Sequence, residues 1–166
     1  MPSVTYRPAD EAAEIAARLI PEWHPHLVDA RIVYVFRSEA EIREGKLKLG
    51  SCRKVGGLNA WLAQSNDPPQ PDGNDFFVIE LAEPEWHERL SDRQREALVD
   101  HELSHAYCEW GENEELKLSL VHHDIEEFAV IIDRHGLWHD DLTVFASSIA
   151  GALNVRIDDS DIPRPE

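Results

Sequence analysis

The sequence predicts an α+β fold, in which a small twisted three-stranded sheet packs on an N-terminal helix and on a longer central helix, with further helices toward the C-terminus. Three observations predict this arrangement. Residues 9–20 have the mixed apolar and charged pattern of an amphipathic helix. Three segments that we expect to form the strands of the sheet follow, and two of them are rich in β-branched and aromatic residues. Beyond them, the run from Ser91 to Trp110 contains no Gly or Pro, as a long helix requires.

The first half of the chain supplies the N-terminal helix and the sheet. The helix is expected to close at Pro21, because proline interrupts helical hydrogen bonding. We expect the three strands at residues 32–36, 51–63 and 76–81. Gly56 and Gly57 interrupt the second strand, which indicates a bulge or a close backbone approach. Residues 66–74 hold three Pro and a Gly and are expected to form a loop.

The central helix begins with a capping signal. Ser91 is followed three residues later by Gln94, which is the pattern of a capping box. Four apolar residues then recur at i, i+4, i+7 and i+11 and form one stripe: Val99, Leu103, Ala106 and Trp110. The helix is expected to end at Gly111, since Gly commonly terminates helices. Cys108 would then lie in this helix.

His101, Glu102 and His105 form an HExxH pattern on this helix, beside the apolar stripe. Residues i and i+4 lie one above the other on a helix, so the spacing aims both imidazoles at one point. Two His ligands with an adjacent carboxylate are the core of a zinc hydrolase site. We therefore expect Zn²⁺ as the cofactor, His101 and His105 as ligands, and Glu102 as general base.

A second cluster follows at residues 122–128, and it offers a third zinc ligand. A catalytic zinc takes three protein ligands and keeps a fourth position open. The candidates are His122, His123, Glu126 and Glu127. A helix is expected over residues 124–135, with a buried stripe of Ile125, Phe128, Ala129 and Ile132. A last helix is expected over residues 140–153, with Leu142, Phe145, Ile149 and Leu153 on one face.

Two stretches of the sequence resemble known metalloprotease families. HELSHAY at residues 101–107, with His123 shortly before Glu127 and Phe128, is similar to the SprT-like zinc metalloproteases. HDIEEFAV at residues 123–130, with HGLW at 135–138, resembles a family of phage metallopeptidases, and this likeness runs from about Ile32 to Trp138. The resemblance implies a phage or prophage origin, a minimal zincin-like domain and peptide-bond hydrolysis.

The same resemblance implies His123 as the third zinc ligand, beside His101 and His105. A competing likeness to gluzincins, in the run from Glu126 to Ala129, would make Glu126 the ligand instead, and Glu127 and His122 stay open. Candidates for stabilising an oxyanion are His122, Tyr107, Arg134 and His135. In zincins an edge strand of the sheet binds the substrate polypeptide by β-addition, and we expect one of the three predicted strands to do so here; Gly56 and Gly57 draw attention to residues 51–63.

The net charge of −17 argues against general affinity for nucleic acid, because the field of the protein would repel phosphates. Five cations nevertheless gather in a short stretch: Arg43, Lys46, Lys48, Arg53 and Lys54. They form either a solvated hairpin edge or a docking strip for an acidic partner or a nucleic acid. Two alternatives to a peptidase stay open: a zinc-binding interaction module of zincin fold that no longer cleaves, and an acidic DNA mimic, which the net charge permits.

Composition favours one domain over residues 1–157, followed by an acidic flexible tail at 158–166. No apolar run reaches the length of a membrane span, and the N-terminus lacks a signal-peptide pattern, so we expect a cytoplasmic protein. Cys52 and Cys108 form no metal-binding pair and are expected to be free thiols. The sequence leaves the oligomeric state and the cleavage specificity open.

Overall fold

The computed structural model describes residues 3–63, 75–125, 128–138 and 140–153, in two units, Met1–Val121 and His122–Glu166. The first unit contains the strands β1 (Tyr6–Pro8), β2 (Ile32–Arg37), β3 (Glu41–Arg43), β4 (Lys46–Lys48), β5 (Gly50–Val55), β6 (Phe76–Ala82), β7 (Ala106–Trp110) and β8 (Leu116–Leu120). Its helices are α1 (Asp10–Trp23), a 3₁₀ turn (Pro25–Leu27), α2 (Gly57–Ala63), α3 (Glu83–Glu88) and α4 (Asp92–Ser104). The second unit contains α5 (Ala129–His135) and α6 (Asp140–Ala152). The predicted mixed α+β class is confirmed.

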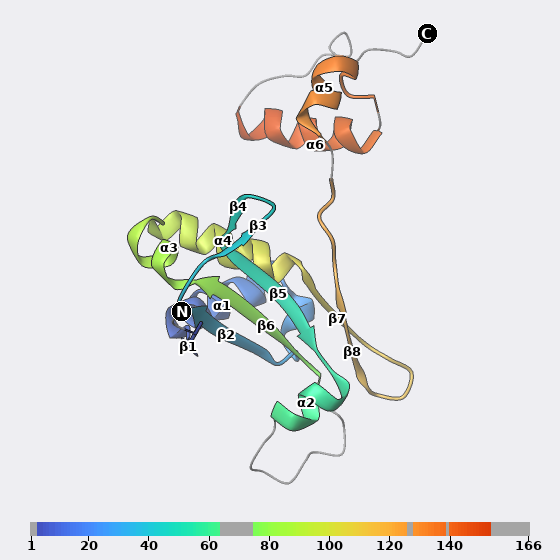
Figure 1. Ribbon diagram of the computed structural model, residues 1–166. Coiled ribbons are helices and arrows are strands. Elements are labelled where there is room, and N and C mark those ends of the chain that lie inside the picture. Colours follow the sequence, from blue (N-terminus) through green and yellow to red (C-terminus); the bar gives the residue numbers. More distant parts are fainter. Residues whose placement is uncertain (1–2, 64–74, 126–127, 139, 154–166) are drawn as a thin grey trace. The chain divides into compact units, whose positions relative to one another are not determined.

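The central sheet has four strands in the order β1-β2-β6-β5 (Figure 1). Strands β2 and β6 run parallel, while β1 and β5 are antiparallel to their neighbours. The strands predicted at residues 32–36 and 76–81 are confirmed, but the expected number of three is wrong. The additional strand β1 has only three residues, which is too short to show an alternating pattern. Strand β5 forms one edge of the sheet.

The strand predicted over residues 51–63 ends at Val55, and α2 takes its place from Gly57. Gly57 has a φ of +56°, a conformation that side chains disfavour, and it turns the chain out of the sheet. The Gly57 amide then donates to the Asp75 carboxylate at 3.2 Å, which fixes the turn. The pair of glycines therefore marks the end of the strand and not a bulge within it. The loop predicted at residues 66–74 lies outside the described residues.

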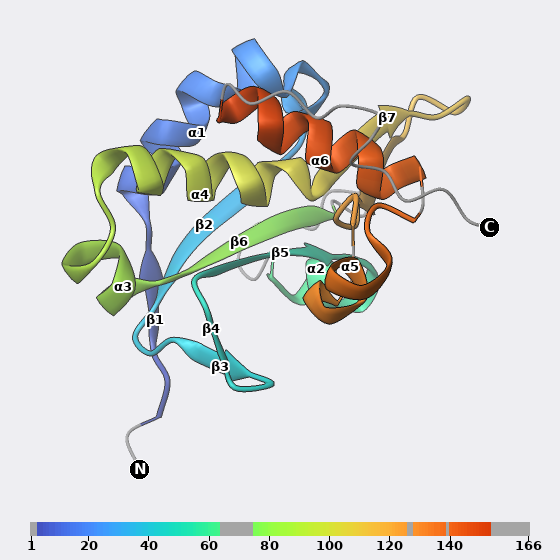
Figure 2. The ribbon, with the colours of Figure 1, turned by 90° about the horizontal axis from the view of Figure 1, so that it is seen from above.

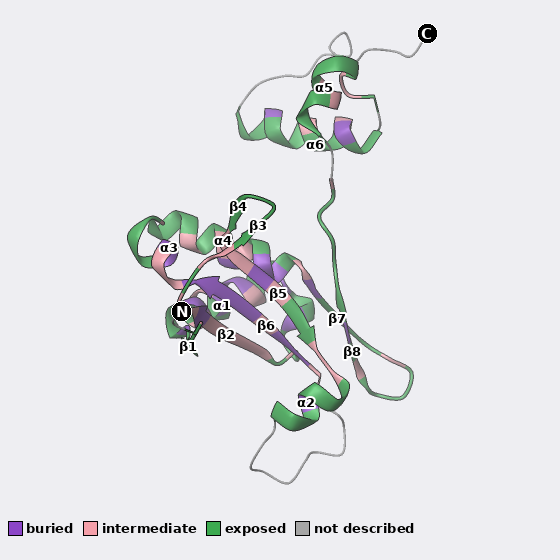
Figure 3. Cartoon of the chain, viewed as in Figure 1, coloured by how far each residue is buried: buried purple, intermediate pink, exposed green. Residues whose placement is uncertain are grey.

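Helices α1 and α4 pack on the same face of the sheet (Figure 2). The core between them is built from large side chains that are essentially inaccessible, including Phe36, Phe77, Trp86, Val99 and Leu103. Strand β6 is almost entirely buried, as Figure 3 shows, because it lies in the middle of the sheet under both helices. Of the predicted α4 stripe, Val99, Leu103 and Ala106 are buried, but Trp110 is 60% exposed.

Helix α1 continues past Pro21 to Trp23, contrary to the expected stop. Proline lacks an amide proton, so Pro21 removes only one hydrogen bond in the last turn of the helix, and the His24 amide still reaches the Ile20 carbonyl at 3.0 Å. The described helices include none that is both long and apolar enough to cross a membrane.

In the second unit, α5 begins at Ala129, later than the predicted start at residue 124. Phe128 is 76% exposed, so the expected buried stripe is wrong at that position. Helix α6 matches the predicted helix at residues 140–153 within one residue, with Leu142 buried. The other three residues of its expected apolar face are exposed: Phe145, Ile149 and Leu153. The predicted tail at 158–166 lies outside the described residues.

Candidate metal and catalytic site

Helix α4 sets the positions of the two motif histidines. Its N-terminus carries the predicted capping box: Ser91 Oγ accepts from the Gln94 amide at 3.3 Å, and Gln94 Oε1 accepts from the Ser91 amide at 3.0 Å. The helix then reaches His101 and His105 on one face, with ring centroids 5.0 Å apart and ring planes at 82°. The spacing therefore brings two imidazoles together, as the HExxH pattern predicts.

The helix ends at Ser104, not at Trp110, and β7 begins directly after His105. Ala106 to Trp110 fit the stripe of a helix, but they also pair with β8, from Ala106↔Leu120 to Trp110↔Leu116. Leu116 to Leu120 alternate strictly between leucine and polar residues, which is the strand signal that sequence reasoning missed. Cys108 consequently lies in β7, where its Sγ donates to the His26 carbonyl at 2.7 Å.

The β7–β8 hairpin returns the chain to the end of α4. The Val121 amide donates to the His105 carbonyl at 2.8 Å, and His105 Nδ1 lies 2.7 Å from the Val121 carbonyl. A carbonyl can only accept, so Nδ1 must carry the proton of this imidazole. The lone pair of the neutral ring is then on Nε2, which is the nitrogen left for a metal.

His123 follows Val121 by two residues, and residues 121–123 are not helical. One ligand nitrogen each from His101, His105 and His123 lies within 4.8 Å of the others, so the three could hold a metal ion. His101 and His123 are exposed, and His105 is half-buried. Imidazole nitrogens are ligands for zinc and for other transition metals.

Glu102 differs from His101 and His105 because it is buried, with 4% of its surface exposed. It lies under Gly50 of β5: a Cβ built on Gly50 would be 2.6 Å from Glu102 Oε1. Burial raises the pKa of this carboxyl to about 7, while His105, Lys48 and a hydrogen bond from the Cys52 backbone pull it down. A carboxyl with a pKa near neutrality can both accept and release a proton at physiological pH. Sequence reasoning did not identify Gly50, because its contact with Glu102 is non-local.

The other predicted site residues lie in different places. Tyr107 is on β7, where its ring packs 5.4 Å from that of His26. His122 is exposed next to His123, and Arg134 and His135 are in α5. The alternative ligands Glu126 and Glu127 are outside the described residues. An oxyanion role for Tyr107, His122, Arg134 or His135 stays a prediction.

Cys52 lies beside this site and should be unreactive in the folded protein. Burial raises the pKa of its thiol to about 12, helped by the negative charge of Glu102. At pH 8 only about one thiol in ten thousand would be ionised, and the thiolate is the nucleophile. We expect Ellman's reagent to label Cys52 much more slowly in the native protein than in urea. Stoichiometric native labelling within seconds, in a Cys108→Ser background, would contradict this picture.

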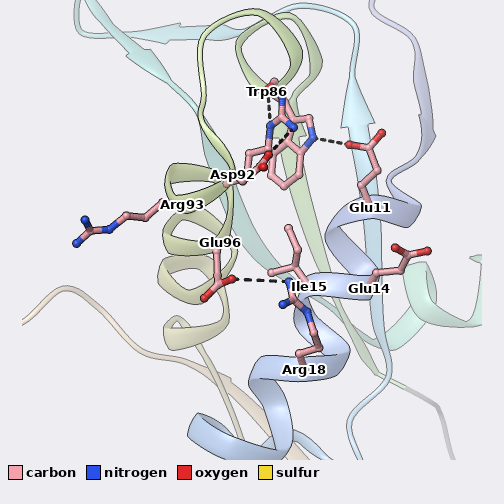
Figure 4. A pocket seen from close by; sticks show the side chains of 9 residues that line it. Glu11, Glu14, Ile15, Arg18, Trp86, Asp92, Arg93 and Glu96 are labelled. Carbon is pink, nitrogen blue, oxygen red and sulfur yellow. Dashed lines mark hydrogen bonds and ion pairs between the residues drawn. The ribbon is translucent and has the colours of Figure 1, made fainter.

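A separate hollow of about 500 Å³ lies where α1 and the start of α4 meet Trp86 (Figure 4). Trp86 Nε1 donates to Glu11 at 2.9 Å, and Arg18 pairs with Glu96 at 3.7 Å. These interactions link α1 to α3 and α4. The hollow contains none of the candidate metal or base residues, so it is not the site of the HExxH motif.

No curated protein and no solved structure matches the chain. A family described as "Putative phage metallopeptidase" matches residues 4–149, which is most of the chain and includes the three histidines and Glu102. The resemblance to phage metallopeptidases is thus confirmed, and the chain belongs to this family.

Proposed function

We propose that this protein is a zinc-dependent peptidase in which His101, His105 and His123 hold the metal and Glu102 is the general base. The observation that carries the proposal is the group of three imidazoles with ligand atoms within 4.8 Å, directly beside a buried glutamate. Zinc binding alone would need the histidines but not that carboxylate. A zinc ion bound there would supply a Lewis acid and would lower the pKa of a water molecule.

The chain's own residues account for the proton transfers. Glu102 accepts a proton as water attacks the peptide carbonyl, and it delivers that proton to the departing amine. The Cys52 backbone and the position of Gly50 orient its carboxylate, so the base needs little reorganisation during the reaction. His105 Nδ1 donates a hydrogen bond to the Val121 carbonyl, and this bond fixes the orientation of the imidazole that would bind the metal.

Strand β5 is the candidate substrate-binding strand of a zincin-like arrangement. The Leu49 carbonyl accepts from the Ala82 amide on β6 at 2.9 Å. Backbone groups alternate between the two sides of a strand, so those of Gly50, Cys52 and Lys54 are directed to the outer edge. Within the described residues no strand pairs with that edge. The Cys52 backbone on that edge already has a hydrogen bond to Glu102, so an extended polypeptide would add through the other edge groups, next to Glu102.

The assignment of the third ligand can be tested with two adjacent histidines. We expect His123→Ala to lower zinc affinity at least about tenfold, because it removes one of three ligands, and His122→Ala to leave the affinity nearly unchanged. Zinc content would be measured after equilibration with a competing chelator. If His123→Ala kept its zinc while Glu126→Gln or Glu127→Gln lost it, the ligand would be that glutamate.

The activity itself is tested by hydrolysis of a peptide library by the zinc-loaded protein. We expect cleavage that stops when 1,10-phenanthroline removes the metal and returns when zinc is added back. Stoichiometric zinc without any cleavage would instead identify an inactive metal-binding module.

A further inference from the structure

We propose that the hairpin β3–β4 selects substrates with acidic side chains on the C-terminal side of the cleaved bond. This inference rests on the proposed peptidase function and adds the substrate class. The hairpin consists of Glu41–Arg43 and Lys46–Lys48, joined by Glu44 and Gly45, and it projects from the start of β5 (Figures 1 and 2). One face of the hairpin, called here the cationic face, carries Arg43, Lys46 and Lys48 together with a single carboxylate, that of Glu41.

Two positive charges repel each other across this hairpin, and a bound anion would relieve that repulsion. Arg43 and Lys46 are directly opposite each other in the ladder, and like charges in that position destabilise a sheet. Both are exposed, and no ion pair found among the described residues involves either of them. A carboxylate bound between the two side chains would neutralise this repulsion.

Two of the five cations in the sequence cluster are already used by the fold. Arg53 is 3.2 Å from the buried carboxylate of Glu80, and Lys54 is 3.2 Å from Asp75. Lys48 is at 3.9 Å from Glu41, which is the limit of an exposed ion pair and contributes little. The docking function therefore belongs to the hairpin and not to the whole cluster.

The hairpin is next to the proposed catalytic centre. Lys48 is two residues before Gly50, whose Cα lies against the Glu102 carboxylate, and Lys48 acts electrostatically on that carboxylate. In the proposed binding mode the polypeptide adds antiparallel to β5 and therefore runs from the Val55 end toward the Gly50 end of that strand. Its residues beyond the cleaved bond would then pass β4 and meet the cationic face.

An acidic polypeptide suits this surface better than a nucleic acid does. The protein has a net charge of −17, which repels a long polyphosphate, whereas a few carboxylates on an extended peptide need only the local cations. The outer edge of β5, which lies beside the hairpin and pairs with no strand of the described residues, also matches the backbone of a peptide and not that of a nucleic acid.

The test uses the full-length, zinc-loaded Glu102→Gln protein, so that binding is measured without cleavage. Three labelled peptides of equal composition carry three Asp after the central bond, three Asp before it, or Asp spread evenly. We expect the first to bind about tenfold more tightly in fluorescence anisotropy at low salt, and this preference to shrink as salt is added. The same order is expected for kcat/KM of the wild-type enzyme.

Charge-reversal variants show whether the preference comes from the hairpin or from the net charge of the protein. Arg43→Glu with Lys46→Glu should abolish the preference, whereas Arg93→Glu with Lys117→Glu changes the net charge equally at other exposed positions and should keep it. Equal binding of all three peptides overturns the inference, and so does tighter binding of a single-stranded oligonucleotide through Arg43 and Lys46. Selective binding without wild-type cleavage would support the docking surface but refute the peptidase function.

Discussion

Replacing Glu102 by Gln is expected to reduce peptide hydrolysis about a thousandfold while the zinc content stays that of the wild type. Gln keeps the size of the side chain and can still accept the hydrogen bond from the Cys52 backbone, but it cannot take a proton from water. The measurement is kcat on any peptide that the wild-type enzyme cleaves, together with elemental analysis of zinc. Retained activity would show that another group is the base, and lost zinc would show that Glu102 is a ligand.

The effect of Glu102→Gln on stability can be measured independently of activity. In the metal-free protein the carboxyl has a pKa of about 7, against 4.5 for an unshifted glutamate. Between these values the folded state binds more protons than the unfolded state, so stability falls as pH rises from about 4.5 to 7, by about 3 kcal/mol in total. Gln does not ionise, so it removes this pH dependence of stability. We expect the metal-free variant to be more stable than the metal-free wild type at pH 8, and the advantage to shrink at pH 5, in urea unfolding with EDTA.

The features that could be predicted from the sequence are the local ones. The capping box at Ser91 and the spacing of His101 and His105 depend only on neighbouring residues, and the structure reproduces both. The buried strands at 32–36 and 76–81 are likewise recognisable from their own composition.

Features that depend on distant partners were predicted wrongly or not at all. Ala106 and Trp110 fit the period of a helix as well as that of a strand, and pairing with β8 decides in favour of the strand. His123 was named from the family resemblance alone, because helical spacing cannot place a residue that lies before the start of α5 at Ala129. Gly50 gives no sequence signal for its role, because only the packing of β5 on α4 brings it to Glu102.

Gly50→Ala is expected to lower kcat about a hundredfold without loss of zinc. The new Cβ would be 2.6 Å from Oε1, 3.1 Å from Cδ and 3.2 Å from Cγ of Glu102, so the carboxylate must move. A displacement of about 1 Å at a catalytic group can reduce the rate by two orders of magnitude. The backbone at Gly50 is not left-handed, so Ala is tolerated there and the effect on stability should be small.

Gly151→Ala is the matched control, because a Cβ on this α6 residue meets no atom within 4 Å. It should leave kcat unchanged. A double variant then shows whether Gly50 acts through Glu102: in a Glu102→Gln background, Gly50→Ala should reduce the residual rate no further, since the base is already lost. If instead Gly50→Ala alone kept full activity, or if the two effects simply multiplied, the contact between β5 and Glu102 would not be what positions the base.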